Sequence, residues 1–296
     1  MDNETILFDR LNVIRDVIRL HGEDKFYLSF SGGKDSTVLH YLLDDALPGN
    51  QIPRVFVDTG IEYNDIKEFV LSMQAVDERI QIIKPTQNVR QVLDAYGYPF
   101  KSKEYSQNLS TYQKSGMCHT VERYLSGVKD KFTCPKILRY QFTPEFKLKI
   151  SKACCQKLKK EPFKKWQREN GRSIAITGMM ASEGGQRESI KGCIITDKDG
   201  KASKFHPLLK VSEEWEQWYI VKRGIKLCKL YYPPYSFKRT GCKGCPFALH
   251  LQECLEVMGR LMPAERKQCE LIWQPVYAEY RRIGYRLNKE EQLRLF

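Results

Sequence analysis

Several features that would define a class of protein are absent from this 296-residue sequence. It has no apolar run of the roughly 18 to 20 residues that a membrane-crossing helix needs, and residues 1–5 are acidic where a signal peptide would be basic. It also lacks repeats and low-complexity linkers. A composition of 42% hydrophobic and 29% charged residues excludes wholesale disorder and a collagen-like chain. We therefore expect a cytoplasmic protein of one large domain or two smaller ones.

Acidic residues are scarce in two parts of the chain, which carries a net charge of +13. Residues 136–172 hold twelve basic and three acidic residues, and residues 222–243 hold seven basic residues and no acidic one. The first segment contains Cys154-Cys155, and the pair Cys242-x-x-Cys245 lies at the end of the second. These segments are either solvated lysine faces or, if they converge in space, a positive funnel for a polyanion or an anionic nucleotide.

Short apolar runs alternate with helical patterns in the first part of the sequence. Strands are predicted at residues 26–30, 54–57, 80–83 and 173–177. An amphipathic helix is predicted at residues 4–20, a second helix at residues 37–47, and a third that follows the strand at residues 54–57 and ends at residue 73. This alternation predicts an α/β fold, with a doubly wound, mostly parallel sheet covered on both faces. Residues 88–172 are expected to form a basic helical insertion, and helices are expected after about residue 205.

The loop at residues 31–36 follows a predicted strand and opens a predicted helix. Adjacent glycines allow a tight turn, and the N–H groups at a helix start attract an anion. The spacing is not that of a Walker A loop, which needs four residues between its glycines. Lys34 is expected to reach a phosphate, and the hydroxyls of Ser31 and Ser36 to donate to its oxygens.

This loop resembles the PP-loop of the ATP-pyrophosphatase-like superfamily, whose members cleave ATP between the α and β phosphates or bind adenylyl sulfate nucleotides. Asp58-Thr59-Gly60 is similar to the adenosine-holding segment of its phosphoadenylyl sulfate (PAPS) reductase branch, and the segment from Gly178 to Arg187 resembles that branch's anion-binding loop. The resemblance implies an adenine nucleotide α-hydrolase-like fold. The implied nucleotide-binding residues are Ser31, Gly32, Gly33, Lys34, Asp35, Ser36, Asp58, Thr59, Gly60 and Gly178, and the implied catalytic residues are Lys34, Asp35 and Arg187.

Four of the ten cysteines form two close pairs, Cys154-Cys155 and Cys242-x-x-Cys245. Four thiolates can enclose a [4Fe–4S] cluster. The alternatives are a Cys₄ zinc site, for which a tandem pair is unusual, and buried cysteines without a ligand. The pattern Cys-Cys-x-x-x-Lys-x-x-Pro at residues 154–162 is similar to the cluster-binding block of assimilatory adenylyl sulfate (APS) reductases, so the resemblance implies a cluster on these four cysteines, with Lys159 beside it.

The sequence departs from those reductases at residues 288–296, which contain no counterpart of the nucleophilic cysteine in their C-terminal tail. Together with the basic segments beside the cysteines, this departure favours a role similar to that of the cluster-bearing sulfurtransferases that thiolate tRNA or place sulfur in the DNA backbone. The favoured prediction is therefore ATP-dependent sulfur transfer to RNA or DNA, with ATP and magnesium at the PP-loop and sulfur from a donor protein arriving through the cluster or a free cysteine. The alternatives are a divergent APS or PAPS reductase served by a thiol reductant, and a non-catalytic nucleotide or redox sensor. The predicted domains are a PP-loop domain at residues 1–210 and a helical part at residues 211–296 that completes the cluster site.

Overall fold

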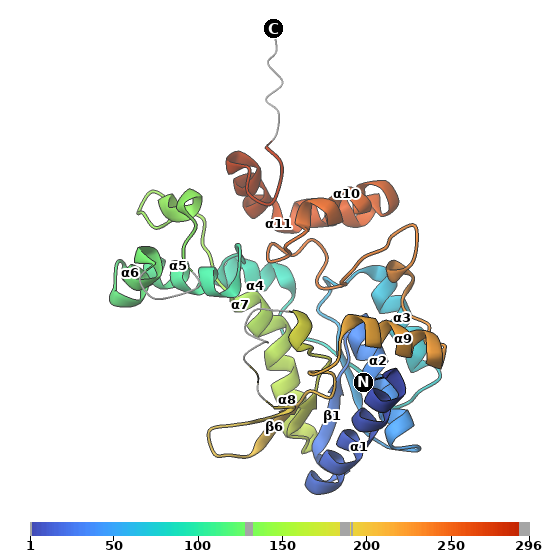
Figure 1. Cartoon of the computed structure of the whole chain (residues 1–296). Helices are drawn as coiled ribbons and strands as arrows, with labels where there is room; N and C mark the ends of the chain where they lie inside the picture. The colour runs from blue at the N-terminus through green and yellow to red at the C-terminus, as the bar shows by residue number, and fades with distance from the viewer. Residues whose placement is uncertain (1, 128–132, 184–189, 191, 290–296) are drawn as a thin grey trace. The chain divides into compact units, whose positions relative to one another are not determined.

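The computed structural model describes residues 2–127, 133–183, 190 and 192–289 (Figure 1), apart from the side chain of Glu183. The chain divides into two compact units, each built from separated segments. The first unit comprises residues 1–58, 62–84 and 162–240, and the second comprises residues 59–61, 85–161 and 241–296. The predicted boundary between a PP-loop domain and a helical part at residue 210 stays a prediction. The two units group residues that lie close in space, and each contains segments from several parts of the chain.

A six-stranded sheet forms the centre of the first unit, with the strand order β3-β2-β1-β4-β6-β5. All neighbouring strands are parallel except β5 and β6, which pair antiparallel. This arrangement confirms the predicted α/β fold with a mostly parallel sheet. The strands are β1 (Phe26–Ser29), β2 (Arg54–Val57), β3 (Ile80–Ile83), β4 (Ile174–Ile176), β5 (Ile194–Thr196) and β6 (Ala202–Phe205).

Helices cover both faces of this sheet, as expected for a doubly wound fold (Figure 1). On one face, Tyr27, Val55 and Ala175 pack against Trp166 of α8, and on the other α2 lies against β1 and carries α1 and α9. The helical segments of this unit are α1 (Asn3–His21), η1 (Glu23–Lys25), α2 (Lys34–Ala46), α3 (Asn64–Gln74), α8 (Glu161–Asn170), η4 (Ala181–Glu183), α9 (Glu213–Arg223) and η6 (Lys229–Tyr231).

The second unit is helical in the residues that the structure describes, as predicted for the insertion and for the part after residue 205. Its core is aromatic: Phe100 packs against Tyr280 with ring centroids 4.5 Å apart and against Tyr105 at 5.7 Å. Its helical segments are α4 (Val89–Tyr96), α5 (Lys103–Ser115), α6 (His119–Ser126), η2 (Lys136–Gln141), α7 (Ala153–Cys155), η3 (Gln156–Lys160), α10 (Leu251–Leu261) and α11 (Pro263–Ile283).

Two details differ from the sequence-based expectations. The antiparallel pair β5 and β6 was not predicted, and α2 begins at Lys34 rather than at residue 37 because the extended Gly33 serves as its N-cap. Among the described residues, no helix combines the length and apolar character needed to cross a bilayer.

Candidate functional site

The loop between β1 and α2 is held close to α3, in the first unit. Gly32 has φ +68°, and a Cβ placed there would lie 2.7 Å from Cγ2 of Val70 and 3.1 Å from Cγ2 of Ile66. A side chain at this position is therefore excluded by both backbone conformation and space. The glycine predicted from the sequence as a tight-turn residue is required here for close packing as well.

A network of hydroxyl groups fixes the shape of this loop. Ser36 Oγ accepts a hydrogen bond from the Ser31 N–H at 3.1 Å and donates to the Gly33 carbonyl at 2.9 Å, and the Gly33 N–H donates to Ser31 Oγ at 3.3 Å. Gly33 caps α2 without a side chain. The first-turn N–H groups of α2 therefore end beside a preformed loop, an arrangement that favours an anion.

Tyr231, from η6, covers the start of α2. Its hydroxyl accepts a hydrogen bond from the Lys34 N–H at 2.9 Å and lies 2.6 Å from Thr240 Oγ1. A Cβ on Gly33 would meet these two hydroxyl oxygens at 3.2 and 3.4 Å. Tyr231 thus occupies a backbone donor that the sequence analysis assigned to a phosphate.

The Lys34 ammonium is engaged by carboxylates on two sides. It pairs with Glu216 of α9 and lies 3.2 Å from Asp35 Oδ1. Glu216 is fully buried, and in the described structure its Oε1 atom has no hydrogen-bond partner. Glu216 was not predicted from the sequence, and the signal that would have found it is an acidic residue on the buried face of a helix that also buries Trp215 and Tyr219.

Gly178 and Asp58 also lie in the first unit. A Cβ on Gly178 would stand 2.7 Å from the Asp35 Cβ, so the chain after β4 passes directly against the start of α2. Asp58 follows β2, is 8% exposed and forms an ion pair with Lys67 of α3 at 2.7 Å. Thr59 and Gly60 fall in the second unit. The predicted anion contact Arg187 lies outside the described residues, so its role stays a prediction.

All four paired cysteines line one small cavity of about 10 Å³ in the second unit. Apolar side chains, including those of Ile61, Leu158 and Trp273, form the rest of its wall together with Lys159. All ten cysteines are free thiols. The structure thus brings together, around a common space, the two cysteine pairs that the sequence separates by 86 residues.

Aromatic side chains of α11 support the loop that carries the second cysteine pair. Trp273 Nε1 donates to the Lys243 carbonyl at 3.2 Å, the Tyr277 hydroxyl donates to the Gly244 carbonyl, and the Tyr280 hydroxyl donates to the Pro246 carbonyl at 2.9 Å. These bonds satisfy buried carbonyl groups that would otherwise be costly. The loop is therefore held as a rigid turn.

The surroundings of the thiols shift the pKa of the most deeply buried one among them, Cys154. Burial raises the pKa of Cys154, followed by the neighbouring thiols of Cys242, Cys155 and Cys245, while Lys159 acts in the opposite direction. Four thiols in an apolar wall with one cation form a donor set that suits a metal–sulfur group, since thiolates are its usual ligands. Within the described ranges, no three His, Cys, Asp or Glu side chains are arranged to hold a single metal ion.

The sequence is similar to one protein family and to two curated proteins. The sequence model of the family described as phosphoadenosine phosphosulfate reductase domain matches residues 25–134 and 136–248. The glutamine-hydrolyzing GMP synthase of Thermosipho africanus is 29% identical over 119 residues, which is 36% of this chain and 22% of that protein. An uncharacterized protein of Methanocaldococcus jannaschii is 27% identical over 118 residues, 40% of this chain and 27% of that protein.

The chain thus spans about a quarter of the length of these curated relatives. Among solved structures, a PAPS reductase from Candida auris in a phosphate complex is 15% identical, with a TM-score of 0.47, and the match covers 82% of this chain and 96% of that one.

Proposed function

The chain belongs to the phosphoadenosine phosphosulfate reductase domain family, whose PP-loop binds adenine nucleotides, and we propose that it uses ATP to transfer sulfur to a nucleic acid. The observation that carries the nucleotide site is the loop at residues 31–36, whose hydroxyl network and glycine packing preform an anion site at the start of α2.

Nucleotide binding requires two groups of Lys34 to exchange partners. Its N–H leaves the Tyr231 hydroxyl, and its ammonium leaves Glu216, so that both face a phosphate. The first-turn N–H groups of α2 and the helix dipole then stabilise the negative charge of the phosphates. Asp35, beside this ammonium, is suited to bind the magnesium ion that accompanies ATP, because carboxylate oxygens are preferred magnesium ligands.

The proposed reaction has two balanced steps. An oxygen of the nucleic acid attacks the α-phosphorus of ATP, and the bond to the β-phosphate breaks with release of pyrophosphate. Hydrosulfide, delivered by a sulfur donor protein, then attacks the acceptor atom that bears this oxygen, the bond between that atom and the oxygen breaks, and the oxygen leaves as part of AMP. Over the two steps together, one proton is released. Positioning and charge stabilisation by Lys34 account for the first step, as is general for reactions at phosphorus.

We further propose that Cys154, Cys155, Cys242 and Cys245 hold a [4Fe–4S] cluster. Their shared cavity and the cation of Lys159 support this proposal, because a thiolate-bound cluster is net negative. Because the cavity is small, the thiol side chains must move apart to admit the cluster. When bound, it would supply iron sites for holding sulfide or for moving electrons.

Sulfonucleotide reduction is the second candidate, and the family match favours it. A product assay on anaerobically purified protein separates the two functions. With ATP, sulfide and an oligonucleotide, we expect AMP and pyrophosphate, and with adenylyl sulfate and a thiol reductant we expect no sulfite. Sulfite formation without ATP turnover would replace our proposal by the reductase. The control for the role of the PP-loop is the double variant Lys34→Ala/Glu216→Gln, which removes the ammonium without leaving a buried carboxylate. Its activity is compared with that of the single variant Glu216→Gln.

A further inference from the structure

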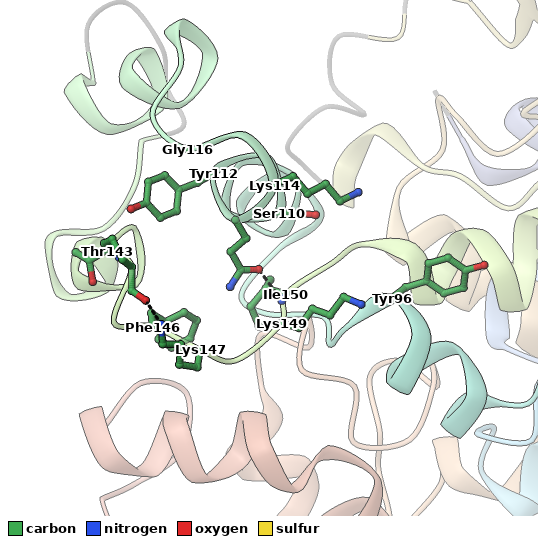
Figure 2. A pocket seen from close by; sticks show the side chains of 12 residues that line it. Tyr96, Ser110, Tyr112, Lys114, Gly116, Thr143, Phe146, Lys147, Lys149 and Ile150 are labelled. Atoms are coloured by element: carbon green, nitrogen blue, oxygen red, sulfur yellow. Dashed lines mark hydrogen bonds between the residues drawn. The ribbon is translucent and has the colours of Figure 1, made fainter.

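A cavity of about 510 Å³ lies in the second unit, among residues that neither the nucleotide loop nor the cysteines use (Figure 2). Its walls come from the end of α4, from the second half of α5 and from the segment at residues 143–150. Ligand pockets in proteins commonly have volumes of about 300 to 1,000 Å³. This cavity is therefore large enough for one or two units of a flexible polymer or for a small organic molecule.

Internal hydrogen bonds build the floor of the cavity. The Gln113 side chain accepts a hydrogen bond from the Ile150 N–H at 3.0 Å and donates to the Leu148 carbonyl at 2.8 Å. On the other side of the same segment, the Lys149 carbonyl accepts from the Tyr98 N–H at 2.8 Å. A Cβ on Gly97 would lie only 2.5 Å from that carbonyl, so the backbones pack closely. The wall is thus preformed.

Lysine side chains supply the only charges among the lining residues. Lys114, Lys147 and Lys149 are exposed and line the cavity, and none of the carboxylates that the structure describes does. The Lys147 ammonium donates to the Pro144 carbonyl at 2.7 Å, and the Lys149 ammonium donates to the Ala95 carbonyl at 2.6 Å. Asp94 of α4 precedes Ala95 in the sequence, and a second exposed acidic residue beside the lining is Glu145. The Thr143 hydroxyl and, more weakly, Lys147 lower its pKa. The cavity therefore carries excess positive charge.

Two aromatic rings also line the cavity, and each packs against a second aromatic ring. Tyr112 of α5 and Phe146 of the 143–150 segment border the same space (Figure 2). Tyr112 packs against Phe142 with ring centroids 5.8 Å apart, and Phe146 packs edge-on against Tyr140 at 6.0 Å. Rings held in this way offer flat apolar faces without further loss of side-chain freedom.

We propose that this cavity binds single-stranded nucleic acid, with a base against Tyr112 and Phe146 and the neighbouring phosphates at Lys114, Lys147 and Lys149. Aromatic rings beside a row of cations are the combination that binds single strands independently of sequence. An acidic peptide would use the lysines and leave the rings without a flat partner. The proposal rests on the proposed function only for the role of the strand as sulfur acceptor, and binding itself is independent of ATP.

The test is fluorescence anisotropy with labelled oligo-dT and oligo-U of about 12 nucleotides, titrated without ATP at about 50 and 200 mM salt. We expect both strands to bind wild type at low salt and binding to weaken steeply with salt, because phosphate contacts release counterions. Lys147→Glu/Lys149→Glu should weaken binding at least tenfold. The matched control, Lys103→Glu/Lys136→Glu, makes the same charge change at exposed lysines of the same unit outside the cavity and should weaken binding much less.

A third variant, Phe146→Leu, tests stacking and should weaken binding several-fold. Thermal melts confirm that each variant is folded. The proposal is overturned by absent binding at low salt, by equal losses in the two double lysine variants, or by a poly-glutamate peptide that binds as tightly as the oligonucleotides and ignores Phe146→Leu. Lys34→Ala/Glu216→Gln should bind the strand normally, so failure of the ATP-dependent function and failure of this site give different results.

Discussion

Replacing Lys34 by alanine should destabilise the fold as well as weaken nucleotide binding. The ammonium is the cationic partner of Glu216, whose side chain is fully buried, and it lies within 3.2 Å of Asp35. In the described structure, Oε1 of Glu216 has no hydrogen-bond partner even with the ammonium in place. The alanine variant therefore leaves a buried carboxylate without its cation.

The size of the effect follows from the burial of the pair. Removing one partner of a buried ion pair costs about 3 to 5 kcal/mol. Because the Lys34 side chain is 22% exposed, we expect the lower end, about 3 kcal/mol. In Lys34→Ala/Glu216→Gln, a neutral amide replaces the carboxylate, and an imperfectly bonded buried amide costs about 1 to 2 kcal/mol. The second substitution should thus restore roughly 1 to 2 kcal/mol of the free energy of unfolding.

Urea unfolding followed by tryptophan fluorescence measures these free energies, and calorimetry measures the affinity for ATP. Glu216→Gln alone should tighten ATP binding, because it frees the ammonium for phosphate. The double variant should bind ATP more weakly than Glu216→Gln by about 1.5 to 3 kcal/mol, the scale of a charge-assisted hydrogen bond. A double variant no more stable than Lys34→Ala would refute the buried-carboxylate argument, and equal ATP affinity with and without the ammonium would refute the phosphate role.

Three further predictions concern other parts of the structure. Tyr231→Phe should destabilise the free protein by about 1 kcal/mol and tighten ATP binding up to about tenfold in calorimetry, because it frees the Lys34 N–H for a phosphate; weaker binding would mean that the hydroxyl itself contacts the nucleotide. Burial, and then the charge of Arg54, lower the pKa of His40 from 6.5 to about 4. Between pH 4 and 6.5 the imidazole therefore binds a proton in the unfolded chain only, so the free energy of unfolding should fall by up to about 3 kcal/mol as the pH drops from 6.5 towards 4. His40→Gln should flatten that slope in urea titrations, and an unchanged slope would contradict the assignment. Anaerobic protein should contain about four irons per chain by metal analysis, Cys154→Ser should lower that content, and one zinc without iron would exclude the cluster.

The central sheet could be predicted from the sequence because its strands are apolar and bounded by turn residues. The four residues of β2 are buried, and β3 was predicted at its observed bounds. The pair β5 and β6 was missed because its seven residues include only one buried side chain, Phe205. Edge strands that face solvent lack the apolar pattern on which such predictions depend.

The nucleotide loop was predictable for a different reason, because its function is carried by neighbouring residues in a strand-to-helix context. Two residues that contact Lys34 from other elements, Glu216 and Tyr231, were not predictable, because they follow it by 182 and 197 positions. Only the packing of α9 and η6 on the sheet domain brings them to the loop. A local pattern contains no information on such a contact, which depends on tertiary structure.

The cysteine site was only partly predictable from the sequence. Their spacing and the resemblance to APS reductases predicted a ligand set, which stays a prediction. The structure adds that the cavity draws residues from all three segments of the second unit: Ile61 from the first, Cys154 from the second and Cys242 and Trp273 from the third. A group bound by the four thiols would cross-link the second and third segments directly. Since a ligand that binds only the folded state stabilises it, cluster binding would stabilise the second unit by joining α7 to the loop that the aromatic side chains of α11 support. A cluster bound there would therefore stabilise the second unit whether its iron took part in sulfur transfer, in reduction or in neither.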